Sequence, residues 1–213
     1  MLPLRQLIER TLRPTLRIES VSPHDPVVAR HVPEPWRVLG CGNYAVVLFH
    51  PGHPELVVKV YAPGRAGFDA ERTVYRRLGK HPAYSRCLHA ENGILVLRRL
   101  HGVTLYDAVH RGLAIPERVI RDIDAALDYA RERGLHPHDV HGRNVMMHEG
   151  RGLVVDVSDF LAEEDCTKWR DLRAAYFRVY RPVFMRLRLR VPYAALDVVR
   201  FGYRIFRRVV PKR

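Results

Sequence analysis

Three short runs rich in β-branched residues lie close together near the start of the chain, and they constrain the fold more than any other feature of the sequence. They are WRVLG at 36–40, AVVLFH at 45–50 and LVVKVY at 56–61. A glycine-containing turn separates the first two runs, and the turn residues PGHPE separate the last two. Runs of this kind, joined by turns, are typical of consecutive antiparallel strands.

Beyond these strands the pattern predicts one helix and then a second hairpin. Residues 68–79 are expected to form the helix, with Asp69 as its N-cap. The runs at 86–90 and 94–100 flank the turn residues ENG, which are typical of a hairpin. The first half of the chain should therefore hold five strands and one helix.

The second half of the chain is expected to be mainly helical. Thr104 can cap a short helix, and Pro116 opens a longer one whose apolar residues keep the 3.6-residue period as far as Gly134. The runs HPHDVHGRNVMM and GLVVDVSDF then predict a small hairpin that carries functional loops. The predicted division is an N-terminal extension, a strand-rich lobe, a mainly helical lobe and a basic tail, at 1–35, 36–100, 101–175 and 176–213.

Composition predicts a folded protein that stays in the cytoplasm. The chain has 47% hydrophobic and 28% charged residues, which is ordinary for a globular protein. No stretch reaches the roughly 18 apolar residues needed to span a bilayer, and charge interrupts the N-terminus before a signal-peptide core could form. Cys41, Cys87 and Cys166 lack metal-ligand spacing, so reduced thiols are expected.

The net charge of +13 is concentrated in the last part of the chain. Residues 168–213 hold 14 Lys and Arg against two Asp, a net charge of +12, whereas the first 167 residues hold 22 basic and 21 acidic residues, a net charge of +1. After Pro192 a basic amphipathic helix is expected, with one apolar face made of Leu196, Val199, Tyr203, Phe206 and Val210. This face either packs on the helical lobe or attaches to an anionic membrane surface. Specific nucleic-acid binding is not expected, because the tail holds no recognition module.

Gly40 and Gly42 belong to the sequence GCGNYAV, a GxGxxAV pattern. A glycine-rich turn can bring backbone N–H groups close to phosphate oxygens, because no side chain intervenes. A dinucleotide-binding fold would need a helix directly after the glycines, whereas a strand follows here and Ala45 replaces the third glycine. The turn therefore fits either a phosphate-binding loop or a plain hairpin turn.

Lys59 lies inside an otherwise apolar strand, where an unpaired ammonium group would be costly to bury. It shares a face with Val57 and Tyr61, so one interpretation is a solvated lysine on the outer face of the sheet. The other directs its side chain toward phosphate groups and toward Glu71 on the following helix.

The order of these features resembles the protein kinase superfamily over residues 36–172. Asp139 and Asn144 stand five residues apart, as in the DxxxxN catalytic loop of that superfamily. Asp156 follows the apolar run LVV, where the family has its metal-binding aspartate. The resemblance implies a two-lobe α+β fold, with a five-stranded antiparallel N-terminal lobe carrying one helix and a reduced, mainly helical C-terminal lobe.

The resemblance also implies a role for each residue, with ATP and Mg²⁺ as cofactors. Asp139 would orient the acceptor hydroxyl or accept its proton, and Asn144 and Asp156 would hold Mg²⁺. Lys59, fixed by Glu71, would bind the ATP phosphates. The remaining cofactor-binding positions lie in the glycine turn, the next strand, the adenine-binding hinge and the ribose-proximal position: Gly40, Gly42, Val47, Arg98, Leu100 and Thr104.

Departures from the family pattern leave the acceptor open. His141 replaces the lysine that serine/threonine kinases carry two residues after the catalytic aspartate, and Pro137 and His138 replace a His-Arg pair. An aspartate followed in this way by histidine resembles aminoglycoside and choline phosphotransferases. Ser158 replaces the glycine of DFG, so Asp159 is a second candidate for the metal ligand.

Three further points concern the same region. The segment between Asp156 and Lys168 is too short for a long activation segment, so switching by phosphorylation there is not expected. Asp171 either braces the catalytic loop, as in the family, or is an exposed first-turn carboxylate. The loop histidines match no zinc pattern, and we expect loop packing for them: His136, His138 and His141.

The sequence thus predicts an ATP-dependent kinase that transfers the γ-phosphate to a hydroxyl, with a protein serine or threonine as the first expectation. Its predicted partners are ATP and an unidentified protein or small-molecule acceptor. The alternatives are a small-molecule, sugar or lipid-linked kinase, a nucleotide-binding pseudokinase, and an adaptor that uses the basic tail on the inner face of the membrane.

Overall fold

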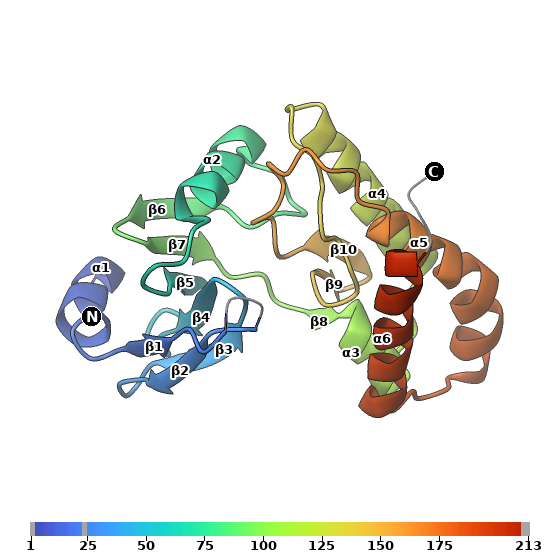
Figure 1. Ribbon diagram of the computed structural model, residues 1–213, viewed down its shortest axis with the longest axis horizontal. Helices are drawn as coiled ribbons and strands as arrows, with labels where there is room; N and C mark the ends of the chain where they lie inside the picture. Colours follow the sequence, from blue (N-terminus) through green and yellow to red (C-terminus); the bar gives the residue numbers. More distant parts are fainter. Residues whose placement is uncertain (1–2, 23–24, 210–213) are drawn as a thin grey trace. The chain divides into compact units, whose positions relative to one another are not determined.

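The computed structural model describes residues 3–22 and 25–209, which form an α+β fold with antiparallel sheets (Figure 1). The chain divides into two compact units. Unit 1 holds the residues up to Leu100 together with 130–137 and 157–163, and unit 2 holds 101–129, 138–156 and the residues from Glu164 onward. The α+β class expected from the sequence is confirmed.

Unit 1 contains a five-stranded antiparallel sheet in the order β3-β4-β5-β7-β6. The positive φ angles of Asn92 and Gly93, 49° and 76°, allow the tight turn between β6 and β7. The strands are β3 (Arg37–Cys41), β4 (Ala45–Phe49), β5 (Leu56–Tyr61), β6 (Cys87–Glu91) and β7 (Ile94–Arg98). All five expected strands are therefore confirmed, with ends that differ by no more than two residues.

One face of this sheet is covered by the N-terminal segment. This segment contains α1 (Leu4–Leu7), the π-helical η1 (Ile8–Leu12) and the hairpin of β1 (Arg17–Glu19) and β2 (Val28–His31). The residues that form this part of the core come from the segment and from alternate strand positions: Leu4, Ile8, Leu12, Val27, Trp36, Val46, Leu48, Val58, Ala62, Ile94 and Val96. This segment was expected only as an N-terminal extension, yet its leucines belong to the core.

The other face of the sheet bears Val47 and Lys59 and carries the helix α2 (Phe68–Leu78), which lies beside β6 and β7 (Figure 1). The helix was expected at this place, but the expectation that Asp69 caps it is wrong. Gly67, with a φ of 110°, occupies the N-cap position, and no side chain caps the helix. Glycine fits here because side chains strongly disfavour this backbone conformation.

Unit 2 is built on a three-stranded sheet in the order β10-β9-β8. Gly152 in β10 lies so close to α4 that a Cβ atom there would come within 2.3 Å of the Val119 carbonyl oxygen. Only glycine permits this approach of strand to helix. The elements are β8 (Val103–Thr104), α3 (Leu105–Arg111), α4 (Glu117–Arg131), β9 (Val145–His148) and β10 (Arg151–Val154).

The C-terminal part of unit 2 is helical. It contains α5 (Lys168–Ala175), the π-helical η2 (Tyr176–Met185) and α6 (Tyr193–Val209). The expected start of a helix just after Pro192 is confirmed, whereas Val210, a member of the predicted apolar face, lies outside the described residues. Within the described ranges, none of the helices combines the length and the apolar character that crossing a membrane requires.

Candidate functional site

A row of residues crosses the α2-covered face of the unit 1 sheet. Gly40 of β3 pairs with Val47 of β4, which pairs with Lys59 of β5, which pairs with Leu95 of β7. Residues directly opposite one another on neighbouring strands share a face. The structure therefore brings three of the predicted cofactor-binding residues into one line.

Lys59 forms an ion pair with Glu71 on α2. The Nζ–Oε2 distance is 2.6 Å, and the side chains are only 12% and 1% exposed. The hydroxyl of Tyr61, two residues along the same face of β5, also donates a hydrogen bond to Glu71 Oε2. Of the two interpretations of Lys59, the structure thus has the one in which the ammonium group meets Glu71.

The glycine turn between β3 and β4 is open to solvent. Gly42 N–H donates to the Ala45 carbonyl oxygen at 2.9 Å, and Val27 N–H donates to the Gly42 carbonyl oxygen at 2.9 Å. A Cβ atom built on Gly40 would meet nothing within 4 Å, and one on Gly42 would meet only the Ala45 carbonyl oxygen, at 3.8 Å. Packing of the folded chain therefore does not require glycine at Gly40.

The predicted hinge residues differ in how far their backbone groups are engaged. Arg98 N–H donates to the Arg86 carbonyl oxygen at 2.9 Å, and its own carbonyl oxygen accepts a 2.6 Å hydrogen bond from Ser85 Oγ. Arg99 N–H donates to the Glu55 carbonyl oxygen at 2.8 Å. Within the described part of the chain, the backbone of Leu100 makes no hydrogen bond.

Thr104 is the N-cap of α3 in unit 2. Its Oγ1 accepts a hydrogen bond from Asp107 N–H at 3.0 Å and donates one to Asp107 Oδ2 at 2.8 Å. This cap was expected from the sequence and satisfies one of the N–H groups left unpaired at a helix start. The hydroxyl predicted to lie near a ribose is thus also a structural cap.

The loop that carries Asp139 is held by its own polar groups. Asp139 has a φ of 54°, an uncommon conformation that aspartate tolerates better than most residues. The Asn144 amide nitrogen, Nδ2, donates to the Asp139 carbonyl oxygen at 3.1 Å, and Asp139 N–H donates to Cys166 Sγ at 3.4 Å. The hydrogen bond between Asn144 and Asp139, which stand five residues apart, therefore closes the loop.

The carboxylate of Asp139 contacts two basic side chains. Its Oδ1 pairs with the ammonium group of Lys168, and its Oδ2 lies 3.8 Å from His141 Nε2. The Asp139 side chain is 29% exposed. Burial lowers the pKa of His141 below its ordinary value, although the nearby carboxylates of Asp139 and Asp156 act in the opposite direction. The neutral imidazole is therefore favoured.

Asn144 and Asp156 lie at the same end of the β9–β10 hairpin. Val145 pairs with Val154, and Val155 N–H donates to the Asn144 carbonyl oxygen at 3.0 Å, directly before Asp156. Because Asn144 Nδ2 is bonded to Asp139, its Oδ1 is the atom left to accept or to ligate. An amide oxygen and a carboxylate are hard ligands of the kind that Mg²⁺ takes from proteins, usually one or two per ion, so the chemistry of these residues fits the ion that the sequence predicts.

Sequence reasoning missed Lys168, which stands 29 residues from Asp139. It is the first residue of α5, and α5 is held to α4 by Asp124, which accepts from Trp169 Nε1 at 2.7 Å and from Arg173 Nε at 2.9 Å. No local pattern in the sequence signals this contact, because it depends on how α5 is held to α4.

Asp171, also on α5, accepts hydrogen bonds from Thr167 Oγ1 at 2.9 Å and from the Tyr203 hydroxyl at 2.7 Å. It therefore links α5 to α6, a role that neither prediction for Asp171 included.

The predicted residues fall into two groups, one in each unit. Unit 1 gathers Gly40, Gly42, Val47, Lys59 and Glu71, with the hinge at the end of β7, and unit 2 gathers Asp139, Asn144 and Asp156. Asp159, the second candidate for the metal ligand, belongs to unit 1, whereas Asn144 belongs to unit 2. Among the residues that the structure describes, no three His, Cys, Asp or Glu side chains are placed to hold a metal ion together.

No protein-family model matches the chain. A protein of Bacillus subtilis (strain 168), named "Putative serine/threonine-protein kinase YrzF", is 30% identical to it over 171 residues. The alignment covers 78% of this chain and 78% of the relative. It is longer than either unit, so it includes residues of both.

Proposed function

The chain belongs to the serine/threonine-protein-kinase-like family of this Bacillus subtilis relative, and on that premise we propose that it is an ATP-dependent phosphotransferase with a protein serine or threonine hydroxyl as acceptor. The observation that carries the proposal is the buried Lys59–Glu71 pair, aligned with Gly40 and Val47 on one face of the sheet. Dehydration offsets most of the attraction within a buried ion pair, so packing stability alone does not account for this one, and a functional role does.

In this proposal, unit 1 binds the phosphates of ATP. The Lys59 ammonium group, fixed by Glu71, contacts the phosphates, and the open turn at Gly40 and Gly42 lets phosphate oxygens approach the backbone without intervening side chains. Leu100 offers the unengaged backbone groups that an adenine ring needs at the hinge.

Unit 2 supplies the groups that act on the acceptor and the metal. Asn144 Oδ1 and the Asp156 carboxylate would hold Mg²⁺, which when bound neutralises charge on the phosphate oxygens. Asp139 orients the acceptor hydroxyl. The hydroxyl oxygen forms a bond to the γ-phosphorus, the bond from that phosphorus to the β-phosphate oxygen breaks, ADP leaves, and the hydroxyl proton passes to Asp139.

Lys168 compensates for the departure at His141. The serine/threonine kinases to which the sequence bears resemblance carry a lysine two residues after the catalytic aspartate, and here Lys168 of α5 brings an ammonium group to the Asp139 carboxylate instead. A cation at this place stabilises negative charge that develops on the transferring phosphoryl group. With Lys168 in this place, His141 does not need to carry a positive charge during phosphoryl transfer.

A second candidate function is the phosphorylation of a small molecule. It is favoured by the imidazole of His141, 3.8 Å from Asp139, and by the short chain between Asp156 and Lys168. Both features resemble small-molecule phosphotransferases more than regulated protein kinases. The acceptor panel below separates the two functions.

The test is transfer of labelled phosphate from ATP in the presence of Mg²⁺. The acceptors are the chain itself, a generic protein substrate, and a panel of amino sugars, simple sugars and choline. Asp139→Asn should lower transfer by about 10²–10⁴-fold, because a positioned acid–base group contributes this much. The control is Asp69→Asn, which changes an exposed carboxylate of unit 1.

The outcomes separate the candidates. Labelled protein that disappears in Asp139→Asn supports the protein kinase, and labelled small molecules favour the second function. Nucleotide binding without transfer to any acceptor would indicate a nucleotide-binding pseudokinase. Failure to bind Mg–ATP in calorimetry would refute the proposal.

A further inference from the structure

The helix α6 packs on unit 2 through its polar and aromatic side. The Tyr193 ring stacks on His110 with 3.6 Å between ring centroids, and its hydroxyl donates to Asp107 Oδ1 at 2.9 Å. One turn further, Asp197 accepts from the Tyr106 hydroxyl at 2.9 Å, and Tyr203 binds Asp171. The acidic residue of the described helix is therefore directed inward.

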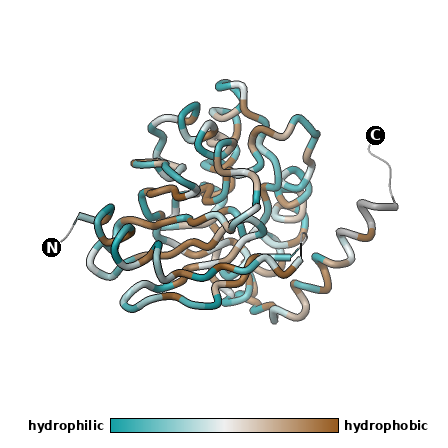
Figure 2. The backbone as a smooth tube through the Cα atoms, turned by 60° about the vertical axis from the view of Figure 1, so that its left-hand side comes forward, coloured by the Kyte–Doolittle hydropathy of each residue, from teal (hydrophilic) through white to brown (hydrophobic). Residues whose placement is uncertain are grey.

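The apolar side of α6 faces solvent. Val198, Phe201 and Ile205 are 70%, 58% and 46% exposed, and their spacing puts them on one face of the helix. Val199, expected on a common stripe with Leu196 and Tyr203, is 69% exposed, whereas those two residues are half-buried. A surface helix of a soluble protein normally has the opposite orientation, and brown segments recur along α6 in Figure 2.

Exposed arginines alternate with exposed apolar residues just before α6. In η2 and the segment after it, Val183, Leu187 and Leu189 are 42%, 63% and 41% exposed. Of the five exposed arginines of the same stretch, Arg181 pairs with Glu117. The side chains of the other four form no ion pair or hydrogen bond with any residue that the structure describes: Arg178, Arg186, Arg188 and Arg190. Their charge is available to a partner.

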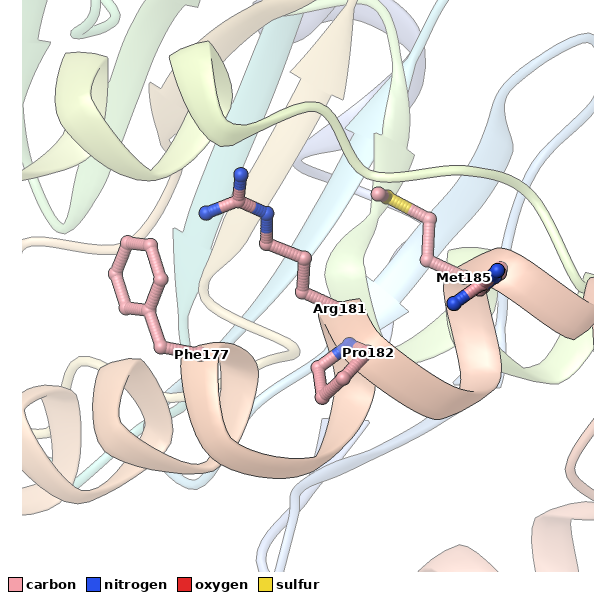
Figure 3. A pocket seen from close by; sticks show the side chains of 5 residues that line it. Phe177, Arg181, Pro182 and Met185 are labelled. Atoms are coloured by element: carbon pink, nitrogen blue, oxygen red, sulfur yellow. The ribbon is translucent and has the colours of Figure 1, made fainter.

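Two hollows in this part of unit 2 combine the same kinds of side chain. Phe177, Arg181 and Met185 project from one side of η2 and, with Pro182 and Arg186, line a hollow of about 480 Å³ (Figure 3). The other, of about 360 Å³, is lined by His110, Arg111, Arg190 and Pro192. Guanidinium groups beside apolar side chains can contact phosphate and hydrocarbon together.

We propose that residues 176–209 form a surface that docks on an anionic lipid bilayer. Val198, Phe201 and Ile205 enter the boundary between headgroups and acyl chains, and the arginines of η2 and the following segment contact lipid phosphates. Charge complementarity selects an anionic surface, because residues 168–213 carry a net charge of +12. Nucleic acid would match the charge but would leave the apolar face exposed.

The experiment measures co-sedimentation of the full chain with vesicles of phosphatidylcholine alone and of phosphatidylcholine with phosphatidylglycerol. Binding should require the anionic lipid and weaken with salt. Val198→Ser with Phe201→Ser, and separately Arg186→Glu with Arg188→Glu, should each weaken binding at least about tenfold. The matched controls change exposed residues of unit 1: Leu88→Ser, and Arg10→Glu with Arg76→Glu.

A fluorescence measurement tests insertion directly. Phe201→Trp should shift its emission to the blue on addition of anionic vesicles, whereas Leu88→Trp should not, since Leu88 lies in unit 1. Binding that persists in both double variants, or no shift at Phe201→Trp, overturns the proposal. The proposal is also overturned if wild type is a dimer in solution that does not bind vesicles, and Val198→Ser with Phe201→Ser converts it to a monomer. A second copy of the chain would then cover this face. The proposal does not depend on phosphoryl transfer, which is measured separately.

Discussion

Replacing Lys59 by methionine removes the ammonium group but keeps an unbranched apolar side chain of similar length. At 2.6 Å and an effective dielectric constant of about 20, the attraction between Lys59 and Glu71 is about 6 kcal/mol. Dehydration of both groups offsets part of this attraction. Glu71, which is 1% exposed, keeps its hydrogen bond from Tyr61 in the variant. We therefore expect Lys59→Met to lower the free energy of unfolding by about 3 kcal/mol, the lower end for a broken buried pair.

Removing both charges should cost far less than removing one. The double variant Lys59→Met with Glu71→Leu leaves no uncompensated buried carboxylate, so its loss should be about 1 kcal/mol or less. It should nevertheless transfer phosphate no better than Lys59→Met, which we expect to be about 10²–10³-fold slower than wild type. The double variant would then be nearly as stable as wild type but as inactive as Lys59→Met, which is the result that a phosphate-binding role for Lys59 requires.

The assay is urea unfolding followed by fluorescence of Trp36, which is buried in the core of unit 1. The control breaks the exposed pair of Asp69 and Arg72 with Asp69→Asn, for which a change within about 0.5 kcal/mol is expected. Suppose that Lys59→Met lowers the free energy of unfolding by less than 1 kcal/mol and that the double variant is no more stable than Lys59→Met. An unpaired Glu71 carboxylate is then not costly in the folded protein, and the argument from a buried ion pair is refuted.

Three further predictions concern the glycine turn, the second ammonium group and pH. Gly40→Ala should leave the free energy of unfolding unchanged within about 0.5 kcal/mol, because its Cβ meets no atom, while KM for ATP rises severalfold. Lys168→Met should lower kcat about tenfold with little change in KM for ATP, because the half-exposed cation acts at Asp139 during transfer. Wild type should lose stability as pH falls through the ordinary imidazole value of 6.5, because the unfolded chain binds a proton that folded His141 resists, and His141→Gln should lessen this loss.

Each of the Gly40, Lys168 and His141 predictions has its own control or contrary result. Gly93→Ala, at a φ of 76°, should destabilise the fold, unlike Gly40→Ala. An unchanged kcat in Lys168→Met would leave that lysine a structural role only. Burial also lowers the pKa values of His50 and His81, so His141→Gln should reduce the loss of stability at low pH without abolishing it. The exposed His136 provides the comparison variant, and an equal effect of His136→Gln would refute the assignment to His141.

Local signals in the sequence were sufficient for the unit 1 sheet and for several helix ends. The β-branched runs, the turn at Asn92 and Gly93 and the cap at Thr104 each act within a few residues, where sequence spacing and space coincide. The wrong prediction of Asp69 as the N-cap of α2 also comes from reliance on local residue types. A preceding glycine in a left-handed conformation had already ended the loop, and composition alone does not give a φ angle.

Contacts between distant segments were beyond such reasoning. Leu4, Ile8 and Leu12 belong to a weak helical pattern that Pro14 interrupts, and the sheet face that they cover explains why they are buried. For α6, periodicity predicts that faces exist but not which one packs. The inward face was decided by ring stacking on His110 and by carboxylates on other helices.

The candidate site shows the same division. The pairing of Lys59 with Glu71 follows from the cost of an unpaired charge in a strand, so it could be anticipated from the residues. Lys168 could not, because its approach to Asp139 depends on how Asp124 and Trp169 fix α5. The assignment of all these residues to ATP and Mg²⁺ stays a prediction until transfer is measured.

The course of the backbone through the two units has a consequence for synthesis on the ribosome. The chain passes from one unit to the other after residues 100, 129, 137, 156 and 163. The sheet of unit 1 leaves the ribosome first, but Leu135 and Phe160, both fully buried in that unit, emerge only later. Nascent chains that end before Phe160 should therefore remain sensitive to protease, and neither unit can be produced as one continuous fragment.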